Sequence, residues 1–441
     1  MLHDAYIDHE DLSCTHIDGR TISTRNNCAG PPAQRSMSTV ASNHRRPGRT
    51  SLRGGRLVLI IVGAIGSMLM PPSSAHATDP VAVDSAAAAG MTWVGPTQGT
   101  AAVFDFDKDG DDDVVPSRHG GAPWPIMRNN GNGTFTEVSR GALDLEDRHG
   151  CIAGDFGTAA NDGHPDGRLD LYCIVGGCRG SQFCSKENDL VFQLPTDGFS
   201  RNQAVARGVA DIHGRARQAM ALDFDKDGLL DLAVANYGPS YYPTPNRLFR
   251  NNGNGTFTDV TSSPVHAEKR SLCGAAGDLD GDGWPDLLFC TGDSNDTIRT
   301  LTYHNDKGSF VDVTASTSYR TVKSRSIKII DLNRDGRMDL IIVEQTRLKI
   351  WLNGAAGLPA QPSYVRAITE GRDVAAGDVN KDGKLDLYVC TGWNGGTSQQ
   401  PDLMLINDGD SRSFHPMAIP QATAGDGDAV AVIPDWKHSG R

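Results

Sequence analysis

One short acidic loop recurs along this chain and constrains its fold more than any other feature. The first copy runs from Asp105 to Asp113, with oxygen-bearing side chains at positions 1, 3, 5 and 9 and Gly110 at position 6. Oxygen ligands around a glycine turn suit a hard cation, so we expect Ca²⁺. The five intact copies carry these ligands at Asp105, Asp107, Asp109 and Asp113 (loop 1); Asp223, Asp225, Asp227 and Asp231 (loop 3); Asp278, Asp280, Asp282 and Asp286 (loop 4); Asp331, Asn333, Asp335 and Asp339 (loop 5); and Asp378, Asn380, Asp382 and Asp386 (loop 6).

The spacing of the loops predicts the architecture. Counting two weaker copies, loops begin at residues 105, 162, 223, 278, 331, 378 and 435. An apolar run enters each intact loop and another leaves it, and Asn-Gly turns mark hairpins further on, as at 251–255. A unit of this length fits four short strands. The sequence therefore predicts an all-β fold, a β-propeller of about seven four-stranded blades, with the last blade incomplete at the C-terminus.

An EF-hand is the main alternative for the Asp-x-Asp-x-Asp-Gly pattern. That loop needs a glutamate at position 12 and a helix on each side. Position 12 here is occupied by Pro116, Val234, Phe289, Ile342 and Val389, and the flanking runs are of the β type. These residues exclude the EF-hand and leave a solvated acidic turn without metal as the other interpretation.

The loops and turns together resemble the FG-GAP/VCBS repeat family, which includes the β-propeller of integrin α chains. Besides the loop pattern, the run Asn-Asn-Gly-Asn-Gly-Thr-Phe-Thr occurs at 129–136 and again at 251–258, and the resemblance covers roughly residues 81–441. It implies Ca²⁺ in the loops that join the first two strands of each blade. The family is functionally broad, so fold alone does not settle function.

Two copies depart from the pattern. Loop 2 offers Asp162, Asp166 and Asp170 but has His164 where a carboxylate is expected; Gly154-Asp-Phe resembles the usual entry, seven residues too early. We treat these three aspartates as weaker metal ligands. Loop 7 begins at Asp435, where Lys437 would oppose a cation, so no metal is expected there.

Residues 1–77 have the character of an export leader. Five arginines precede the apolar stretch 57–70, and Ala75-His-Ala77 follows it. This order is typical of a secretory signal peptide, and Met37 would give a leader of normal length. The stretch is shorter than the span of about 20 apolar residues that crosses a bilayer. We therefore predict a propeller domain at 78–441 without a membrane span, placed outside the cell, in the periplasm or at the cell surface.

Charge and cysteine content agree with this location. The net charge is −12, and the aspartates of the acidic loops account for much of it; no basic stripe is present, so no nucleic-acid partner is expected. Cys273 and Cys290 flank loop 4 on strands expected to be neighbours, and Cys151 and Cys173 flank loop 2 in the same way. Cys178 and Cys184 lie close together in sequence, and Cys390 is left over. Disulfides are possible after export, with buried thiols as the alternative.

No catalytic residue can be named from the sequence, because it lacks the usual nucleophile, phosphate-loop and zinc-protease motifs. Arg217, Arg325 and Arg372 each lie six residues before the first aspartate of a loop, so they should sit at one height around the axis. A partial ring of this kind suits an acidic ligand. We interpret the chain as a secreted calcium-binding module that recognises an extracellular protein or glycan. The alternative is a polysaccharide lyase or hydrolase that uses the propeller funnel.

Overall fold

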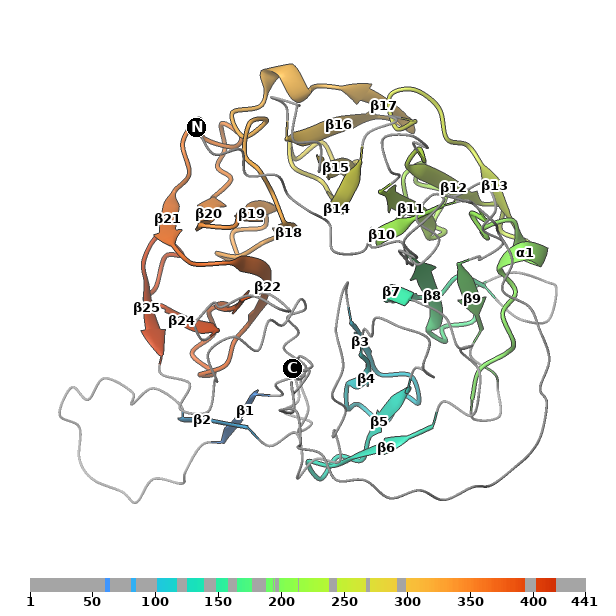
Figure 1. Cartoon of the computed structure of the whole chain (residues 1–441), viewed down its shortest axis with the longest axis horizontal. Helices are drawn as coiled ribbons and strands as arrows, with labels where there is room; N and C mark the ends of the chain where they lie inside the picture. Colours follow the sequence, from blue (N-terminus) through green and yellow to red (C-terminus); the bar gives the residue numbers. More distant parts are fainter. Residues whose placement is uncertain are drawn as a thin grey trace, which may run out of the picture. The chain divides into compact units, whose positions relative to one another are not determined.

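Six antiparallel sheets form the blades of a β-propeller in the computed structural model of this chain (Figure 1). The structure describes residues 60–63, 81–84, 101–116, 125–138, 148–157, 165–176, 188–192, 194, 198–212, 214–237, 244–266, 270–291, 299–392 and 402–417. All of them lie in the second of two compact units, Leu52–Arg441. The prediction of an all-β propeller is confirmed.

Every blade is a meander, since the strands pair in the order of the sequence. Blade 1 contains β3 (Ala102–Phe104), β4 (Asp113–Val115), β5 (Met127–Asn129) and β6 (Phe135–Glu137), and blade 2 contains β7 (Arg148–Gly154), β8 (Asp170–Val175) and β9 (Asp189–Val191). Blade 3 contains β10 (Ala216–Leu222), β11 (Asp231–Asn236), β12 (Arg247–Asn251) and β13 (Phe257–Asp259), and blade 4 contains β14 (Ser271–Gly277), β15 (Asp286–Thr291), β16 (Thr300–Asp306) and β17 (Ser309–Asp312). Blade 5 contains β18 (Ser326–Ile330), β19 (Asp339–Val343), β20 (Arg347–Trp351) and β21 (Tyr364–Ala367), and blade 6 contains β22 (Gly371–Gly377), β23 (Asp386–Thr391), β24 (Leu403–Asn407) and β25 (Phe414–Met417).

The predicted number of blades was too high for the described part of the chain. About seven were expected from seven acidic loops, whereas the described residues form six blade sheets, of which blade 2 has three strands and the others four. Loop 7 belongs to residues 418–441, outside the described ranges. Strand β2 (Val81–Asp84) pairs with β1 (Ile60–Gly63) in a separate two-stranded sheet, so part of the apolar stretch assigned to the signal peptide is a strand here.

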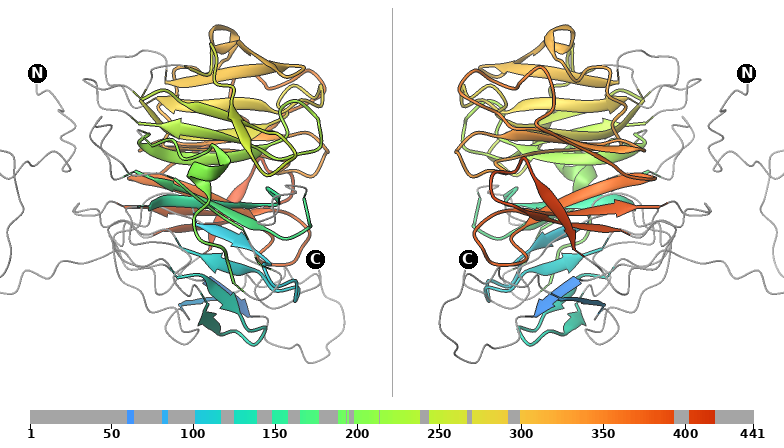
Figure 2. Two further views of the ribbon diagram at one scale, coloured as in Figure 1. Left: turned by 90° about the vertical axis from the view of Figure 1, so that its right-hand side faces the viewer. Right: turned by 90° about the vertical axis from the view of Figure 1, so that its left-hand side faces the viewer.

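The inner strands of the six blades lie side by side in the order β3, β7, β10, β14, β18 and β22. Viewed from the side, the strands run along the direction that Figure 1 looks down (Figure 2). Because each blade starts with its inner strand and turns back through its acidic loop, the loops gather at one face of the propeller. The described residues also include the short helix α1 (Ala204–Arg207) and the 3-10 helix η2 (Thr314–Ser316), and no helix among them is long and apolar enough to cross a membrane.

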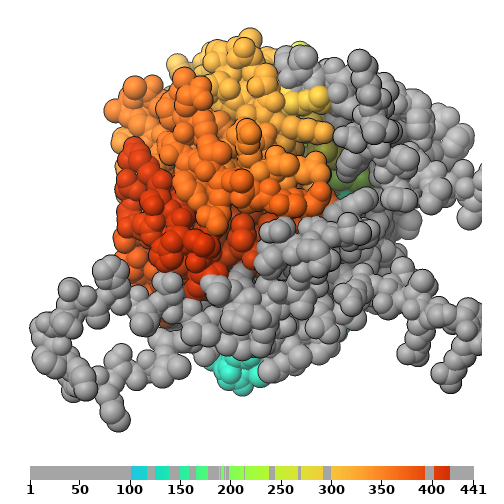
Figure 3. All heavy atoms as spheres, turned by 60° about the vertical axis from the view of Figure 1, so that its left-hand side comes forward, coloured from blue at the N-terminus to red at the C-terminus, as the bar shows by residue number. Residues whose placement is uncertain are grey.

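The second strand of each blade is buried on both sides, which explains its nearly continuous apolar sequence. Side chains alternate between the two faces of a strand. In β11, Leu232 and Val234 join the core shared with blade 2, while Ala233 and Ala235 join the core shared with blade 4. Each pair of consecutive blades is held by a cluster of this kind. In the space-filling view, blades 5 and 6 form one continuous orange and red surface (Figure 3).

Two disulfides join the first and second strands of their blades. Cys151 is bonded to Cys173 in blade 2, and Cys273 to Cys290 in blade 4, as the sequence allowed. Cys390 is buried on β23, and Cys178 and Cys184 lie outside the described residues. Each disulfide closes the hairpin that carries an acidic loop, and such bonds fit an oxidising, extracellular environment.

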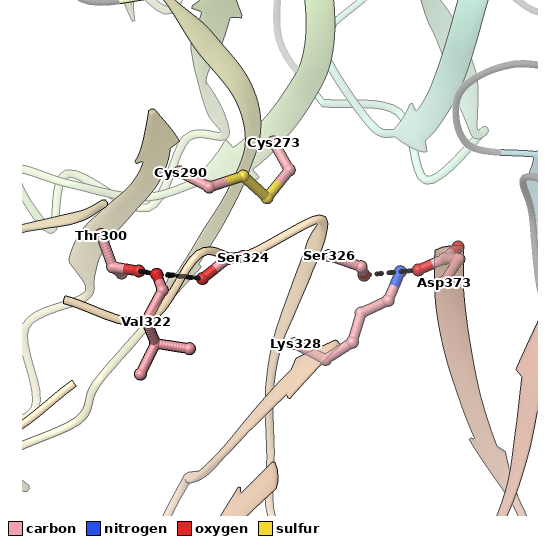
Figure 4. Close-up of a disulfide and its surroundings, with 8 residues drawn as sticks. All are labelled: Cys273, Cys290, Thr300, Val322, Ser324, Ser326, Lys328 and Asp373. Carbon is pink, nitrogen blue, oxygen red and sulfur yellow. Dashed lines mark hydrogen bonds and ion pairs between the residues drawn. A yellow bond between two sulfur atoms is a disulfide. The ribbon is translucent and has the colours of Figure 1, made fainter. Parts of the chain in front are cut away.

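A polar contact joins blades 5 and 6 near the second disulfide (Figure 4). The hydroxyl of Ser326 on β18 donates to Asp373 Oδ1 on β22 at 2.5 Å, and Lys328 Nζ lies 3.1 Å from the same oxygen. Asp373 is buried, so these two partners satisfy a carboxylate that burial would otherwise make unfavourable. The contact is therefore best understood as a link between inner strands.

Removing the blade 4 disulfide should weaken the propeller measurably. Replacing both Cys273 and Cys290 with serine frees a loop whose ends are 17 residues apart. From the entropy of closing a loop of this length, we expect the free energy of unfolding to fall by about 3 kcal/mol. Thermal unfolding checks this, with Cys151→Ser/Cys173→Ser as the matched pair, which should lose a similar amount. If the blade 4 double variant melts like the parent protein, the bond contributes no stability.

Candidate metal centres

The five intact loops share one backbone conformation. In loop 3, the Asp223 carboxylate at position 1 accepts the N–H groups of Asp227 at 3.1 Å and Gly228 at 3.0 Å. Loops 1, 5 and 6 repeat both bonds, and in loop 4 Asp278 accepts from Gly281 and Gly283. Positions 4 and 6 have positive φ, for example 58° at Lys226 and 88° at Gly228. The glycine at position 6 is thus explained by the turn itself.

The aspartate at position 9 begins the second strand and is buried in all five loops. In loop 3, Asp231 Oδ2 accepts the N–H of Phe224 at 3.0 Å, and Oδ1 accepts the N–H of Asn251 on β12 at 2.8 Å. The same two bonds recur at Asp113, Asp286, Asp339 and Asp386. Position 9 therefore fixes the loop to the blade, in addition to any role it has toward a cation.

Carboxylates crowd together in three loops. Oxygens of Asp105, Asp107 and Asp113 lie within 4.8 Å of one another, as do those of the first three aspartates of loop 3 and of loop 4. In loop 1, Asp107 Oδ1 is buried and accepts no hydrogen bond from the described residues. A buried, unpartnered carboxylate oxygen is costly unless a cation or proton meets it. This donor set fits a hard cation such as Ca²⁺.

Loops 5 and 6 differ because asparagine replaces aspartate at position 3. A basic residue at position 7 also pairs with the aspartate at position 5: Arg337 lies 3.2 Å from Asp335, and Lys384 lies 3.1 Å from Asp382. These loops therefore carry less negative charge than loops 1, 3 and 4. If they bind Ca²⁺, we expect them to bind it more weakly.

Burial raises the pKa of the position 9 carboxyl groups. The effect is strongest at Asp113 and Asp231, where it brings the pKa from 3.8 to about 7, and it brings that of Asp386 to about 6. Backbone hydrogen bonds oppose this shift, and neighbouring loop carboxylates add to it. In the absence of a cation, these groups hold protons at a pH where exposed aspartates are ionised.

The stability of the metal-free protein should therefore fall as pH rises from about 4 to about 7. Folded Asp113 and Asp231 keep protons that the unfolded chain has already released, so the free energy of unfolding decreases across this window. A cation must displace these protons, so Ca²⁺ affinity should increase over the same range. Melting curves of the dialysed protein across this pH range test the loss of stability, and calcium titrations test the increase in Ca²⁺ affinity. Asp231→Asn should flatten the slope; a metal-free protein that gains stability toward pH 7 would contradict the assignment.

Loop 2 is built around a residue that the sequence analysis did not count as a ligand. The Asp155 carboxylate accepts the N–H groups of Asp166 and Gly167, the role of position 1 elsewhere. Asp170 accepts the N–H of Phe156 at 2.9 Å, the role of position 9, while Asp166 is paired with Arg168. Asp162 lies outside the described residues. The Gly154-Asp155-Phe156 entry was the available signal, and the seven-residue interruption obscured it.

Asparagines at the ends of the third strands bond to the acidic loops, and from blade 3 onward they also connect each loop to the preceding blade. We call Asn129, Asn251, Asn305, Asn353 and Asn407 the relay asparagines. The backbone N–H of Asn305 donates to Asp286, and its side-chain amide donates to the position 8 carbonyl of loop 4 at 3.1 Å and to Phe224 O in loop 3 at 2.9 Å. Asn251 and Asn353 reach back in the same way, to Phe156 O and Leu279 O. Asn407 does so through Ser411, whose hydroxyl donates to Leu332 O at 3.3 Å. Hydrogen bonds thus link consecutive loops from blade 2 to blade 6.

The three arginines singled out in the sequence lie at the starts of inner strands, the end opposite to the acidic loops. Each donates to a glycine carbonyl: Arg217 to Gly176 at 3.4 Å, Arg325 to Gly371 at 3.4 Å and Arg372 to Gly392 at 2.8 Å. Arg217 also contacts His149 and stacks on the Tyr237 ring, and Arg325 lies 3.7 Å from Glu370. All three are half-buried. Their role in binding an acidic ligand stays a prediction.

Comparison with known proteins supports the repeat assignment. The profile of the FG-GAP-like repeat matches residues 223–289, 278–342 and 331–389, which contain loops 3 to 6. Cartilage acidic protein 1 of Mus musculus is 29% identical over 177 residues, covering 38% of this chain and 25% of that protein. The protein of the same name from Homo sapiens is 28% identical over 177 residues, and that from Xenopus tropicalis 29% over 179. This chain thus spans about a quarter of the length of these relatives.

The matched region begins at Asp223, the first ligand position of loop 3, and ends at Val389 on β23. It contains the loop conformation, the buried position 9 aspartates and the relay asparagines Asn251, Asn305 and Asn353. The resemblance inferred from the loops is confirmed: residues 223–389 of this chain match the FG-GAP-like repeat.

Proposed function

We propose that this protein is a secreted, calcium-stabilised propeller that recognises an extracellular protein or glycan. The observation that carries the calcium part is the crowding of carboxylates in loops 1, 3 and 4, with Asp107 Oδ1 buried and unpartnered among the described residues. The ligands would be the side chains at positions 1, 3, 5 and 9 of each intact loop. Bound Ca²⁺ would neutralise each cluster and hold the loop shut. Extracellular fluid, where Ca²⁺ is abundant, would fill sites of modest affinity.

The recognition part rests on the face opposite to the acidic loops. There the connections between second and third strands are long: 116–126, 176–188, 237–246, 292–299 and 392–402, against 344–346 in blade 5. Long loops on a rigid scaffold commonly carry binding residues. One of them contains Tyr241 and Tyr242, and Arg217, Arg325 and Arg372 lie at the same end of the blades. Aromatic and arginine side chains are the usual anchors of interfaces.

Secretion is supported by the two disulfides and by the leader-like sequence before residue 78. The match to cartilage acidic protein 1 covers 25% of that protein, so only the role of a propeller module is carried over to this chain. The rival function, a lyase or hydrolase in the funnel, is favoured by no specific arrangement among the described residues.

A binding screen of the calcium-loaded protein tests the proposal. Glycan arrays and a panel of extracellular matrix proteins should yield a ligand, and the double change Tyr241→Ala/Tyr242→Ala should weaken binding by about 2 kcal/mol or more if these rings are anchors. Val365→Ser on β21, half exposed at the outer edge of blade 5, is the matched surface control and should leave binding unchanged. Melting curves show whether each variant stays folded. A screen without any ligand, or binding that survives the tyrosine changes and fails in the control, argues against this recognition face.

A further inference from the structure

The residue before each relay asparagine varies with the charge of the adjacent loop. It is Arg128 in blade 1, Arg250 in blade 3 and His304 in blade 4, where position 3 of the loop is aspartate. It is Leu352 in blade 5 and Ile406 in blade 6, where position 3 is asparagine. Arg128 and Arg250 lie close enough to the position 3 aspartate of their loop to offset part of its negative charge.

In blade 4 this position brings an imidazole into the loop. His304 Nδ1 lies 3.1 Å from Asp280 Oδ2 and 3.1 Å from Asp286 Oδ1, and Nε2 lies 4.0 Å from Asp282 Oδ2. The side chain of His304 is about three-quarters covered, with 27% exposed. Ligand atoms of His304, Asp280 and Asp286 all lie within 4.8 Å of one another. Among the described residues, this is the one such group that combines a nitrogen with carboxylate oxygens.

Arginine and histidine differ in what they can do at this position. A guanidinium keeps its proton at any relevant pH and can only offset negative charge. A neutral imidazole has a lone pair and is a common ligand of Zn²⁺, Cu²⁺ and Ni²⁺, whereas Ca²⁺ takes oxygen ligands. One histidine and two carboxylates, with a water in the fourth position, make a four-ligand set typical of zinc.

We propose that His304, Asp280 and Asp286 form a mixed nitrogen and oxygen site for a divalent transition metal of the zinc type. The site sits on strands β15 and β16 and in loop 4, so it differs in metal preference from the all-oxygen loops 1 and 3. It rests on the proposed function only in that the same loop conformation is held to bind a cation. Asp280 and Asp286 are also calcium ligands of loop 4 in the proposed function, so zinc would compete with Ca²⁺ there. Blade 4 would then take a metal that the neighbouring blades do not bind.

The chain itself supplies the control variants. His304→Arg gives blade 4 the residue found in blades 1 and 3, and His304→Leu gives it a residue like those in blades 5 and 6. His304→Arg places a permanent positive charge beside Asp280 and removes the metal-binding nitrogen. It therefore separates metal ligation from simple offsetting of charge, the role that Arg128 and Arg250 have.

The experiment compares the parent protein with both variants after loading with Zn²⁺ in an excess of Ca²⁺, followed by dialysis and elemental analysis. The parent should retain one equivalent of zinc more than either variant. Titration should show zinc affinity at this site falling by at least about tenfold, the loss seen even for partners outside the first coordination sphere. With Co²⁺ as a probe, the visible absorption of the parent should include a component that His304→Arg lacks.

Equal zinc retention and identical cobalt spectra in the parent and His304→Arg would overturn the proposal. Calcium-dependent melting of each protein is recorded in parallel. If the parent retains more zinc than the variants but Ca²⁺ does not raise the melting temperature, the His304 site is supported and the proposed calcium role is refuted. If Ca²⁺ raises the melting temperature but zinc retention is equal, the calcium role is supported and the His304 site is refuted. A variant that fails to fold shows in its melting curve, and the other substitution then decides the result.

Discussion

Removing Ca²⁺ should lower the melting temperature of this protein by about 10 °C or more. A ligand that binds only the folded state at a hundredfold excess over its Kd stabilises it by about 2.7 kcal/mol per site. For a domain larger than about 300 residues, each kcal/mol shifts the melting temperature by roughly 1–2 °C. Three filled loops therefore account for the expected change, and loops 1, 3 and 4 have the crowded carboxylates that such binding requires.

Differential scanning calorimetry with and without chelator measures this effect, and elemental analysis counts the bound metal. Asp223→Asn with Asp278→Asn should reduce the calcium-dependent shift, because each change removes a charge at position 1 of a crowded loop. The reference is Asp410→Asn, an exposed aspartate outside the acidic loops that pairs with Arg412. A melting curve that chelation leaves unchanged, in a protein that carries no calcium, would refute the calcium role of the loops.

Asp231→Ala should be among the most damaging single changes in the metal-free protein. Both oxygens of this buried carboxylate accept backbone N–H groups, from Phe224 at 3.0 Å and Asn251 at 2.8 Å. Each buried N–H left without an acceptor costs about 1–3 kcal/mol, so the expected loss is about 2–6 kcal/mol. Chemical denaturation in chelator measures it without interference from bound metal.

Asp227→Ala is the matched change within the same loop. Asp227 is exposed and accepts the N–H of Leu229, which water can replace. Its loss should cost little in chelator and appear mainly as weaker calcium stabilisation, while Asp231→Asn, which keeps one acceptor, should fall between the two alanine variants. Equal destabilisation of the metal-free protein at positions 227 and 231 would show that position 9 does not anchor the loop.

The parts of this fold that depend on local sequence could be predicted. The apolar run that leaves loop 3, Leu232 to Ala235, forms a buried strand, and Gly228 has the positive φ that the glycine turn required. The disulfide partners could also be predicted, since Cys273 and Cys290 flank a hairpin whose register places them opposite each other. In each case the determining contacts lie within one blade.

Contacts between blades, and some contacts between strands of one blade, could not be predicted. The sequence predicted Asn251 as the start of a hairpin turn, yet its side-chain amide donates to the carbonyl of Phe156, 95 residues earlier in the chain. His304 lies 18 residues after Asp286, on a strand that carries no acidic motif of its own. Asp155 was set aside because an insertion broke the spacing that defined the loops. Seven loops were counted, whereas the described residues form six blades, because loop 7 lies outside those residues.

The relay asparagines have a consequence for how such a protein can change in evolution. Among the described residues, blades 3, 4 and 5 each bring both halves of a seam: an amide that donates to the previous blade, as at Asn353, and a backbone carbonyl that accepts from the next, as at Leu332. Duplication or loss of one of these repeats would again join a donor to an acceptor and leave no mismatched seam. The number of repeats can therefore drift while the seams stay constant, and it is limited by the geometry of closing the ring.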